Sequence, residues 1–254
     1  MSAYAERASA VFPRIALLGD SMTWIGGDSC QNDTGWSHYL KNSGVAGYID
    51  VYARSGATWT NTRSTCRNPI HYSEILHDDN VIFNQAIRLI ENSDATRTVP
   101  DLIILFAGAN DAWFADKRPG IFDSPATGQT ENLTNRKPDQ ATSLEGSIRL
   151  VCDILHDRFP DSTLLFVTPL QMSKTDAETI FKVSDIIEKT ASETGWITLR
   201  ADKETGITHL QEMKLLKYTY DGVHTNPAGA KILGEFILGK ILSLNTPHQT
   251  TDNL

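Results

Sequence analysis

Residues 14–21 have the sequence RIALLGDS, an apolar run that ends in a Gly-Asp-Ser turn. The apolar part predicts a buried β-strand, and the turn predicts that the strand ends before Ser21. Four later apolar runs have similar length, at residues 48–53, 102–106, 164–167 and 196–199. Short apolar strands that alternate with helices are typical of a parallel sheet that is covered on both faces.

Helical patterns occupy the segments between these strands. Apolar residues recur at a spacing of three or four in four segments: Phe83, Ile87 and Ile90; Ile148, Val151, Cys152 and Leu155; Ile180, Val183, Ile187 and Ala191; and Leu233, Ile237, Ile241 and Leu244. We therefore predict a three-layer α/β/α sandwich with a five-stranded parallel sheet. Residues 1–244 are expected to form a single domain, followed by a polar tail at 245–254.

Composition limits the partners. The chain has 254 residues, is 40% hydrophobic and carries a formal net charge of −8. This length fits one large domain, and the negative charge without a Lys/Arg-rich cluster disfavours nucleic acid and anionic membranes. A small-molecule or oligosaccharide substrate is expected instead, and the oligomeric state is left open. Residues 1–13 lack a signal-peptide core, which predicts a cytoplasmic protein, or an exported one if a signal has been removed.

The three cysteines suggest two environments. Cys152 lies among apolar helix positions and is expected to be a buried thiol. Cys30 and Cys66 lie in loops that the predicted fold brings to the same end of the sheet. A Cys30–Cys66 disulfide is one hypothesis, and it requires an oxidising compartment.

Four short motifs occur in an order that would bring them to one site. They are Gly19-Asp20-Ser21, then Gly56, then Gly108-Ala109-Asn110-Asp111, then Asp221-Gly222-Val223-His224. The first three follow predicted strands, and the carboxyl ends of parallel strands lie at one edge of the sheet, where active sites form. Together the motifs supply a nucleophile, a base, a carboxylate and hydrogen-bond donors.

The chemistry assigns roles to three side chains. Ser21 needs a neutral imidazole to accept its proton during attack on an ester carbonyl, and His224 is the candidate base. Asp221 lies three residues earlier, so one turn of backbone can bring its carboxylate to the other ring nitrogen. Asn226 and Pro227 are expected to cap and begin the next helix, which sets the direction of the loop.

These motifs resemble the SGNH, or GDSL-type, hydrolase family, and the resemblance covers most of the chain. It implies a flavodoxin-like fold and an oxyanion hole made by the backbone amides of Ser21 and Gly56 and the side chain of Asn110. Asp20 and Asp111 are expected to tie loops together. Met22 replaces the family's leucine, a tolerable apolar exchange.

Other enzyme signatures are missing from the sequence. The chain has no Gly-x-Ser-x-Gly nucleophile elbow, which disfavours the α/β-hydrolase fold. It also has no metal-binding or phosphate-binding motif, so we predict neither a metal nor another cofactor.

Tryptophans suggest the substrate. Trp24, Trp59 and Trp113 each lie three residues after a motif residue, and Trp36 closes the first long loop. Indole faces can pack against sugar rings, although these side chains could instead only pack the loops. The polar stretch 114–143 is expected to form an irregular loop beside the site.

We therefore predict a metal-independent serine carboxylic-ester hydrolase that removes acetyl or another short acyl group from a carbohydrate, in the manner of the acetylesterase-like members of the family that it resembles. Two alternatives stay open. One is a lysophospholipase or thioesterase of the same fold, which would need an apolar acyl channel. The other is a non-catalytic carbohydrate-binding domain.

Overall fold

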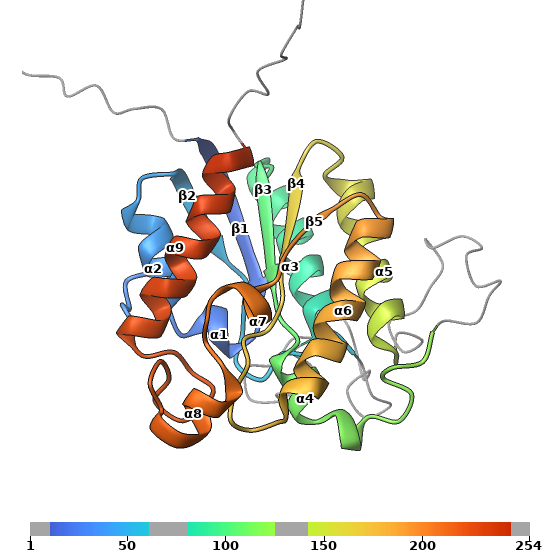
Figure 1. Cartoon of the computed structure of the whole chain (residues 1–254). Coiled ribbons are helices and arrows are strands. Elements are labelled where there is room, and N and C mark those ends of the chain that lie inside the picture. The colour runs from blue at the N-terminus through green and yellow to red at the C-terminus, as the bar shows by residue number, and fades with distance from the viewer. Residues whose placement is uncertain (1–10, 61–80, 125–141, 245–254) are drawn as a thin grey trace, which may run out of the picture.

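The computed structural model describes residues 11–60, 81–124 and 142–244 and contains a five-stranded, entirely parallel sheet (Figure 1). The strands are β1 (Phe12–Gly19), β2 (Ala46–Val51), β3 (Leu102–Phe106), β4 (Thr163–Val167) and β5 (Ile197–Leu199). Their order across the sheet is β2-β1-β3-β4-β5. The predicted α/β class and the flavodoxin-like arrangement are confirmed, and only the bounds of the strands differ from the predicted runs.

The main difference in bounds lies at the second strand. We predicted residues 48–53, but β2 ends at Val51, and Tyr52 and Ala53 lie beyond it. Because β2 is an edge strand, its pattern is only partly apolar, and Tyr48 is 69% exposed. By contrast, all five residues of β3 are buried, as expected for a central strand covered on both faces.

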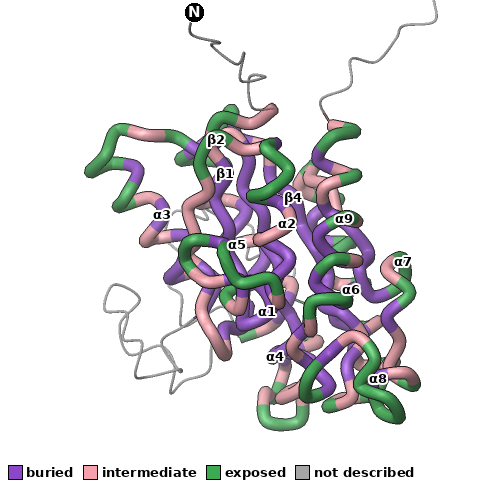
Figure 2. The backbone as a smooth tube through the Cα atoms, turned by 90° about the vertical axis from the view of Figure 1, so that its left-hand side faces the viewer, coloured by how far each residue is buried: buried purple, intermediate pink, exposed green. Residues whose placement is uncertain are grey.

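Helices cover both faces of this sheet. The larger ones are α2 (Trp36–Asn42), α3 (Ile82–Thr96), α5 (Leu144–Arg158), α6 (Ala177–Glu193) and α9 (Pro227–Leu244). Right-handed crossovers place α2 on one face and α3, α5 and α6 on the other. Helix α9 packs beside α2, and α5 contacts both α3 and α6. Buried residues accordingly follow the strands and the inward sides of the helices (Figure 2).

Shorter helices gather at the carboxyl end of the strands. They are α1 (Ser21–Trp24), α4 (Ala109–Trp113), the 3-10 helix η2 (Ala115–Lys117), α7 (Ala201–Glu204) and α8 (His209–Leu215). In Figure 1, α1, α4 and α8 lie together at the lower end of the sheet. No helix in the described ranges combines the length and the apolar character needed to cross a bilayer.

Three of the four predicted apolar stripes form buried helix faces, apart from the half-buried Leu244 at the end of α9. The helix predicted from the stripe of Phe83, Ile87 and Ile90 is confirmed as α3. These residues are only half-buried, and the inward face of α3 includes Gln85 and Leu89 instead. Gln85 can occupy this core position because the backbone groups of Gly19, at the end of β1, form hydrogen bonds with its side-chain amide.

Candidate active site

The site begins where the direction of the sheet reverses. The chain moves from β1 outward to β2 and then back across to β3, and open α/β folds form their binding sites at such a reversal of strand order. Gly19 pairs with Phe106 at the ends of these strands, and the Asp20 amide donates to the Phe106 carbonyl at 3.3 Å. The Gly-Asp-Ser and Gly-Ala-Asn-Asp motifs therefore start side by side.

Ser21 is the first residue of α1. Asp20 caps this helix, because its carboxylate accepts a 2.9 Å hydrogen bond from the Met22 amide. The amide of a first helical residue has no partner within the helix, and that of Ser21 has none elsewhere in the described residues. Ser21 is 8% exposed, so the residue lies nearly buried at the start of α1.

The second motif lies against the third. Gly56 has φ of +76°, a conformation that favours glycine and allows its amide to turn away from the preceding strand. The Asn110 side-chain amide donates to the carbonyl of the next residue, Ala57, at 2.9 Å. An asparagine amide carries two hydrogens, so one is left for another acceptor. Asn110 is thereby held in place beside the Gly56 loop.

Asp111 ties the same two loops together. Its carboxylate accepts hydrogen bonds from the amides of Trp59 and Thr60, at 2.9 and 3.1 Å, and from the Thr60 hydroxyl at 2.8 Å. Asp111 is fully buried. Its contacts are those of the loop-tying residue that we predicted.

The Asp-x-x-His motif forms a local pair. The Asp221 carboxylate lies 2.7 Å from Nδ1 of His224 and also accepts the amides of Val223 and His224, at 2.9 and 2.8 Å. Burial acts to raise the pKa of Asp221, but the hydrogen bonds from the His224 ring and from these amides outweigh it and hold the pKa below its usual 3.8. The carboxylate is thus kept charged beside the ring.

The next helix begins as expected. The Asn226 side-chain oxygen accepts the amides of Ala228 and Gly229, at 3.0 and 3.1 Å, and α9 starts at Pro227. The Thr225 hydroxyl donates to the Thr34 carbonyl at 2.7 Å, which fastens the His224 loop to the segment after α1. The C-terminal motif is therefore anchored to the segment that links α1 to α2.

Burial dominates the electrostatics of Asp20. Burial raises the pKa of this residue from 3.8 to about 7, and the negative charge of Asp111 adds to the rise. The amides of Met22 and Ala109 act in the opposite direction. Neither the Ser21 hydroxyl nor Nε2 of His224 has a hydrogen-bond partner in the described part of the chain.

One residue that sequence reasoning missed supports this arrangement. The Gln85 side chain from α3 accepts the Gly19 amide and donates to the Gly19 carbonyl, both at 2.8 Å. Gln85 is fully buried and holds the end of β1 two residues before Ser21. Its only signal in the sequence was a polar residue between apolar helix positions.

The tryptophans divide into two groups. Trp24 is 43% exposed and Trp113 is half-buried, stacked on Phe114. Trp59 is only 1% exposed and stacks on Phe166, so our prediction that it lines the substrate is wrong. Trp36 is also buried, and its Nε1 donates to Thr23 at 3.3 Å. Trp59 and Trp36 pack the loops because each bulky ring fills the core beneath them.

The predictions about the cysteines, the polar segments and metal binding can be compared with the structure only in part. Cys152 is buried as predicted, and burial raises its thiol pKa to about 12. Cys30 is also a buried free thiol, but Cys66 lies outside the described residues, as do the polar tail 245–254 and most of the loop 114–143. Within the described ranges, no cluster of His, Cys, Asp and Glu side chains has an arrangement that could hold a metal ion.

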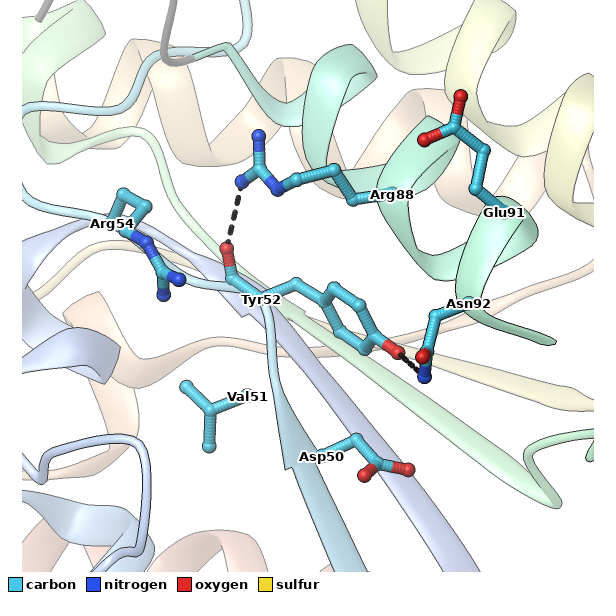
Figure 3. Close-up of a pocket in the computed structure, with 7 residues that line it drawn as sticks. All are labelled: Asp50, Val51, Tyr52, Arg54, Arg88, Glu91 and Asn92. Carbon is cyan, nitrogen blue, oxygen red and sulfur yellow. Dashed lines mark hydrogen bonds between the residues drawn. The ribbon is translucent and has the colours of Figure 1, made fainter. Parts of the chain in front are cut away.

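A polar hollow lies next to the second motif, between the end of β2 and α3 (Figure 3). It has a volume of about 540 Å³ and is lined by Asp50, Val51, Tyr52, Arg54, Arg88, Glu91 and Asn92. Arg88 donates to the Tyr52 carbonyl at 3.1 Å, and Asn92 donates to the Tyr52 hydroxyl at 2.8 Å. The residues described as lining it include none of Ser21, Asp221 and His224.

Comparisons with known proteins identify the family and the fold. A family model described as the GDSL-like lipase/acylhydrolase family matches residues 17–232. No curated protein matches the chain. A protein from Lactobacillus plantarum has a similar structure, with a TM-score of 0.59, 19% identity, and coverage of 91% of this chain and 97% of that one.

Two further solved structures share the fold. The lipase/acylhydrolase from Enterococcus faecalis has a TM-score of 0.55 and 16% identity, over 93% of this chain and 99% of that one. LAE5, an alpha/beta hydrolase enzyme from the metagenome of Lake Arreo in Spain, also has a TM-score of 0.55 and 16% identity, over 95% and 100% of the two chains.

Proposed function

The chain belongs to the GDSL-like lipase/acylhydrolase family and is an ester hydrolase, and on this basis we propose that Ser21, His224 and Asp221 are its catalytic triad. Ser21 attacks the ester carbonyl while Nε2 of His224 accepts the hydroxyl proton. Asp221 holds the ring through Nδ1 and stabilises the imidazolium that forms. The observation that carries this proposal is the 2.7 Å contact between the Asp221 carboxylate and Nδ1 of His224.

The acyl-enzyme step follows from the same geometry. Attack converts the carbonyl oxygen to an oxyanion, and His224 then returns its proton to the leaving alcohol. A water molecule, activated by His224, hydrolyses the acyl-Ser21 ester. Catalytic hydrogen bonds often tighten only when substrate binds, so an open Ser21–His224 pair is compatible with this sequence of steps.

Three donors are proposed to stabilise the oxyanion. They are the amides of Ser21 and Gly56 and the second hydrogen of the Asn110 side chain. One preorganised donor of this kind contributes about 3–4 kcal/mol to transition-state stabilisation. The bond from Asn110 to Ala57 supports the assignment, because it restricts the rotation of the amide group.

For the substrate we propose an acetyl or other short acyl ester of a carbohydrate. Trp24 is exposed three residues after the nucleophile, and Trp113 is half-buried three residues after Asn110. Such indole faces suit the C–H faces of a sugar ring. With Trp59 in the core, the proposal depends on two tryptophans instead of three.

A second candidate is an ester with a longer acyl chain, as in a lysophospholipase or thioesterase. One observation favours it. Exposed apolar side chains gather on α8 and the loop that leads to Asp221, namely Leu210, Met213, Leu215, Leu216 and Tyr220, and each is at least 45% exposed. Clusters of this kind often bind apolar ligands.

A fluorophosphonate probe tests the proposed triad. We expect it to label the native wild-type protein at Ser21 and not to label Ser21→Ala, whereas His224→Ala should react very slowly. Absence of native labelling would instead favour a non-catalytic carbohydrate-binding domain. Rates on p-nitrophenyl esters of increasing chain length then separate the substrates, and equal or higher rates on long chains would overturn the short-acyl proposal.

A further inference from the structure

Glu212 in α8 is a buried carboxylate that the triad does not use. Its side chain is fully buried, and no ion pair among the described residues includes it. Burying a carboxylate without a cation is costly unless hydrogen bonds replace its water. A group held at this cost needs a structural explanation in its surroundings.

The donors to Glu212 come from the base of the catalytic loop. The Tyr218 amide donates to both carboxylate oxygens, at 3.0 and 3.3 Å, and the Thr219 hydroxyl donates to Oε2 at 2.5 Å. Hydrogen bonds to an ionised acceptor are about twice as strong as neutral ones. Glu212 therefore fixes two consecutive residues just before Asp221.

Thr219 passes this constraint on to the catalytic motif. The Thr219 hydroxyl donates its only hydrogen to Glu212, so the same oxygen can act only as an acceptor toward other groups. It accepts a hydrogen bond from the Gly222 amide at 3.0 Å. The Gly222 carbonyl accepts the Ser173 amide at 2.7 Å. Gly222 has φ of +88°, and a Cβ there would lie 1.7 Å from the Ser173 hydroxyl oxygen, so a larger residue would not fit in this turn.

Residues 219–225 form a hairpin whose two sides are joined next to Glu212. The Tyr220 amide donates to the His224 carbonyl at 2.8 Å, and Thr219 pairs with Thr225 across an antiparallel bridge. The two sides of the hairpin are thus fixed at the Glu212 end, and the Asp221–His224 pair lies at its tip. A change of structure at the Glu212 end of the hairpin would therefore displace the His224 imidazole from Ser21.

We propose that Glu212 is a positioning residue for His224, acting through Thr219 and Gly222. The inference rests on the proposed function, because it concerns how the base reaches Ser21. A misplacement of about 1 Å can reduce catalysis by roughly 100-fold, so a loosened hairpin should lower kcat while substrate binding changes little.

The test compares Glu212→Gln, Glu212→Ala and Thr219→Val with the wild type. With p-nitrophenyl acetate we expect kcat to fall by roughly 10- to 100-fold in Glu212→Ala and less in Glu212→Gln, which keeps one acceptor oxygen, with KM changed less than about twofold. The rate of fluorophosphonate labelling at Ser21 should fall in parallel. Amide exchange in residues 217–226 should become faster in all three variants.

Asp101→Asn is the matched control. Asp101 is another carboxylate that accepts a backbone amide, that of Arg14 at 2.7 Å, but it lies at the opposite end of the sheet. It should lose stability without any change in kcat. Because Glu212 and Thr219 act in one chain of hydrogen bonds, the double variant Glu212→Gln/Thr219→Val should resemble the worse single one.

The outcomes separate the two proposals. A wild-type protein that hydrolyses no ester and resists labelling would remove the proposed function, and the inference with it. An active wild type with unchanged kcat in folded Glu212→Gln and Thr219→Val would overturn the role of Glu212 alone. If Glu212→Ala does not fold, these two milder variants still decide. Unchanged amide exchange in residues 217–226 would also overturn that role.

Discussion

Replacement of Asp20 by asparagine should make the free energy of unfolding less sensitive to rising pH. Burial raises the pKa of Asp20 from 3.8 to about 7, so between these values the unfolded chain has released a proton that the folded chain keeps. The stability that depends on this proton is fully present below pH 3.8 and is lost as the pH rises through 7. At 1.36 kcal/mol for each pH unit, the loss amounts to roughly 4 kcal/mol.

Asparagine does not titrate, so the difference between the two proteins isolates this effect. The variant keeps the side-chain oxygen that accepts the Met22 amide at 2.9 Å, and with it the cap of α1. We expect the free energy of unfolding of the wild type, relative to Asp20→Asn, to decrease by roughly 4 kcal/mol between about pH 4 and pH 8.

Urea unfolding, followed by tryptophan fluorescence at several pH values, measures this difference. Equal m-values in the two proteins would show that the unfolded states are comparable. If the two stability curves stay parallel within about 1 kcal/mol over this range, the reasoning is refuted. In that case the amides of Met22 and Ala109 would outweigh the burial of the carboxylate.

Three further predictions follow from the described contacts. Hydrogen bonds hold the pKa of Asp221 below 3.8, so its contribution to stability is present above that value and is lost as the pH falls. The free energies of unfolding of Asp221→Asn and the wild type should therefore converge at acidic pH. Trp59→Ala should lose about 3–5 kcal/mol in urea unfolding, whereas Trp24→Ala should lose less than about 0.5 kcal/mol and raise KM for an acetylated sugar; a large stability loss at Trp24 would contradict this division. Gln85→Ala leaves the buried Gly19 amide without its acceptor and should cost about 1–3 kcal/mol in the same assay, and a neutral substitution would show that water replaces the amide.

Local patterns were sufficient to predict the five strands, four of the helices and one part of the site. Short apolar runs between helical stripes predicted five parallel strands, because burial on both faces demands that pattern. The Asp221–His224 contact was also predictable, since three residues of a tight turn are enough to close it. The start of α9 at Asn226 and Pro227 was predictable for a similar reason, because a helix cap involves only residues that are neighbours in the sequence.

Contacts between distant residues were beyond such patterns. Gln85 bonds to Gly19 across 66 positions in the sequence, and nothing in the α3 stripe distinguishes it from a surface glutamine. Trp59 has the same spacing from its motif as Trp24, yet one is buried and the other exposed. Spacing along the chain carries no information about which side of a loop faces the core.

The sequence by itself determined the five strands, four of the helices, the ends of the strands where chemistry can occur and the pairing of Asp221 with His224, because each depends on hydrophobic period or on local backbone geometry. Only the tertiary structure decided the buried state of Asp20, the core position of Trp59 and the support of the catalytic loop by Glu212. Burial and long-range hydrogen bonds arise when separate elements pack, and packing depends on shapes that no single segment encodes.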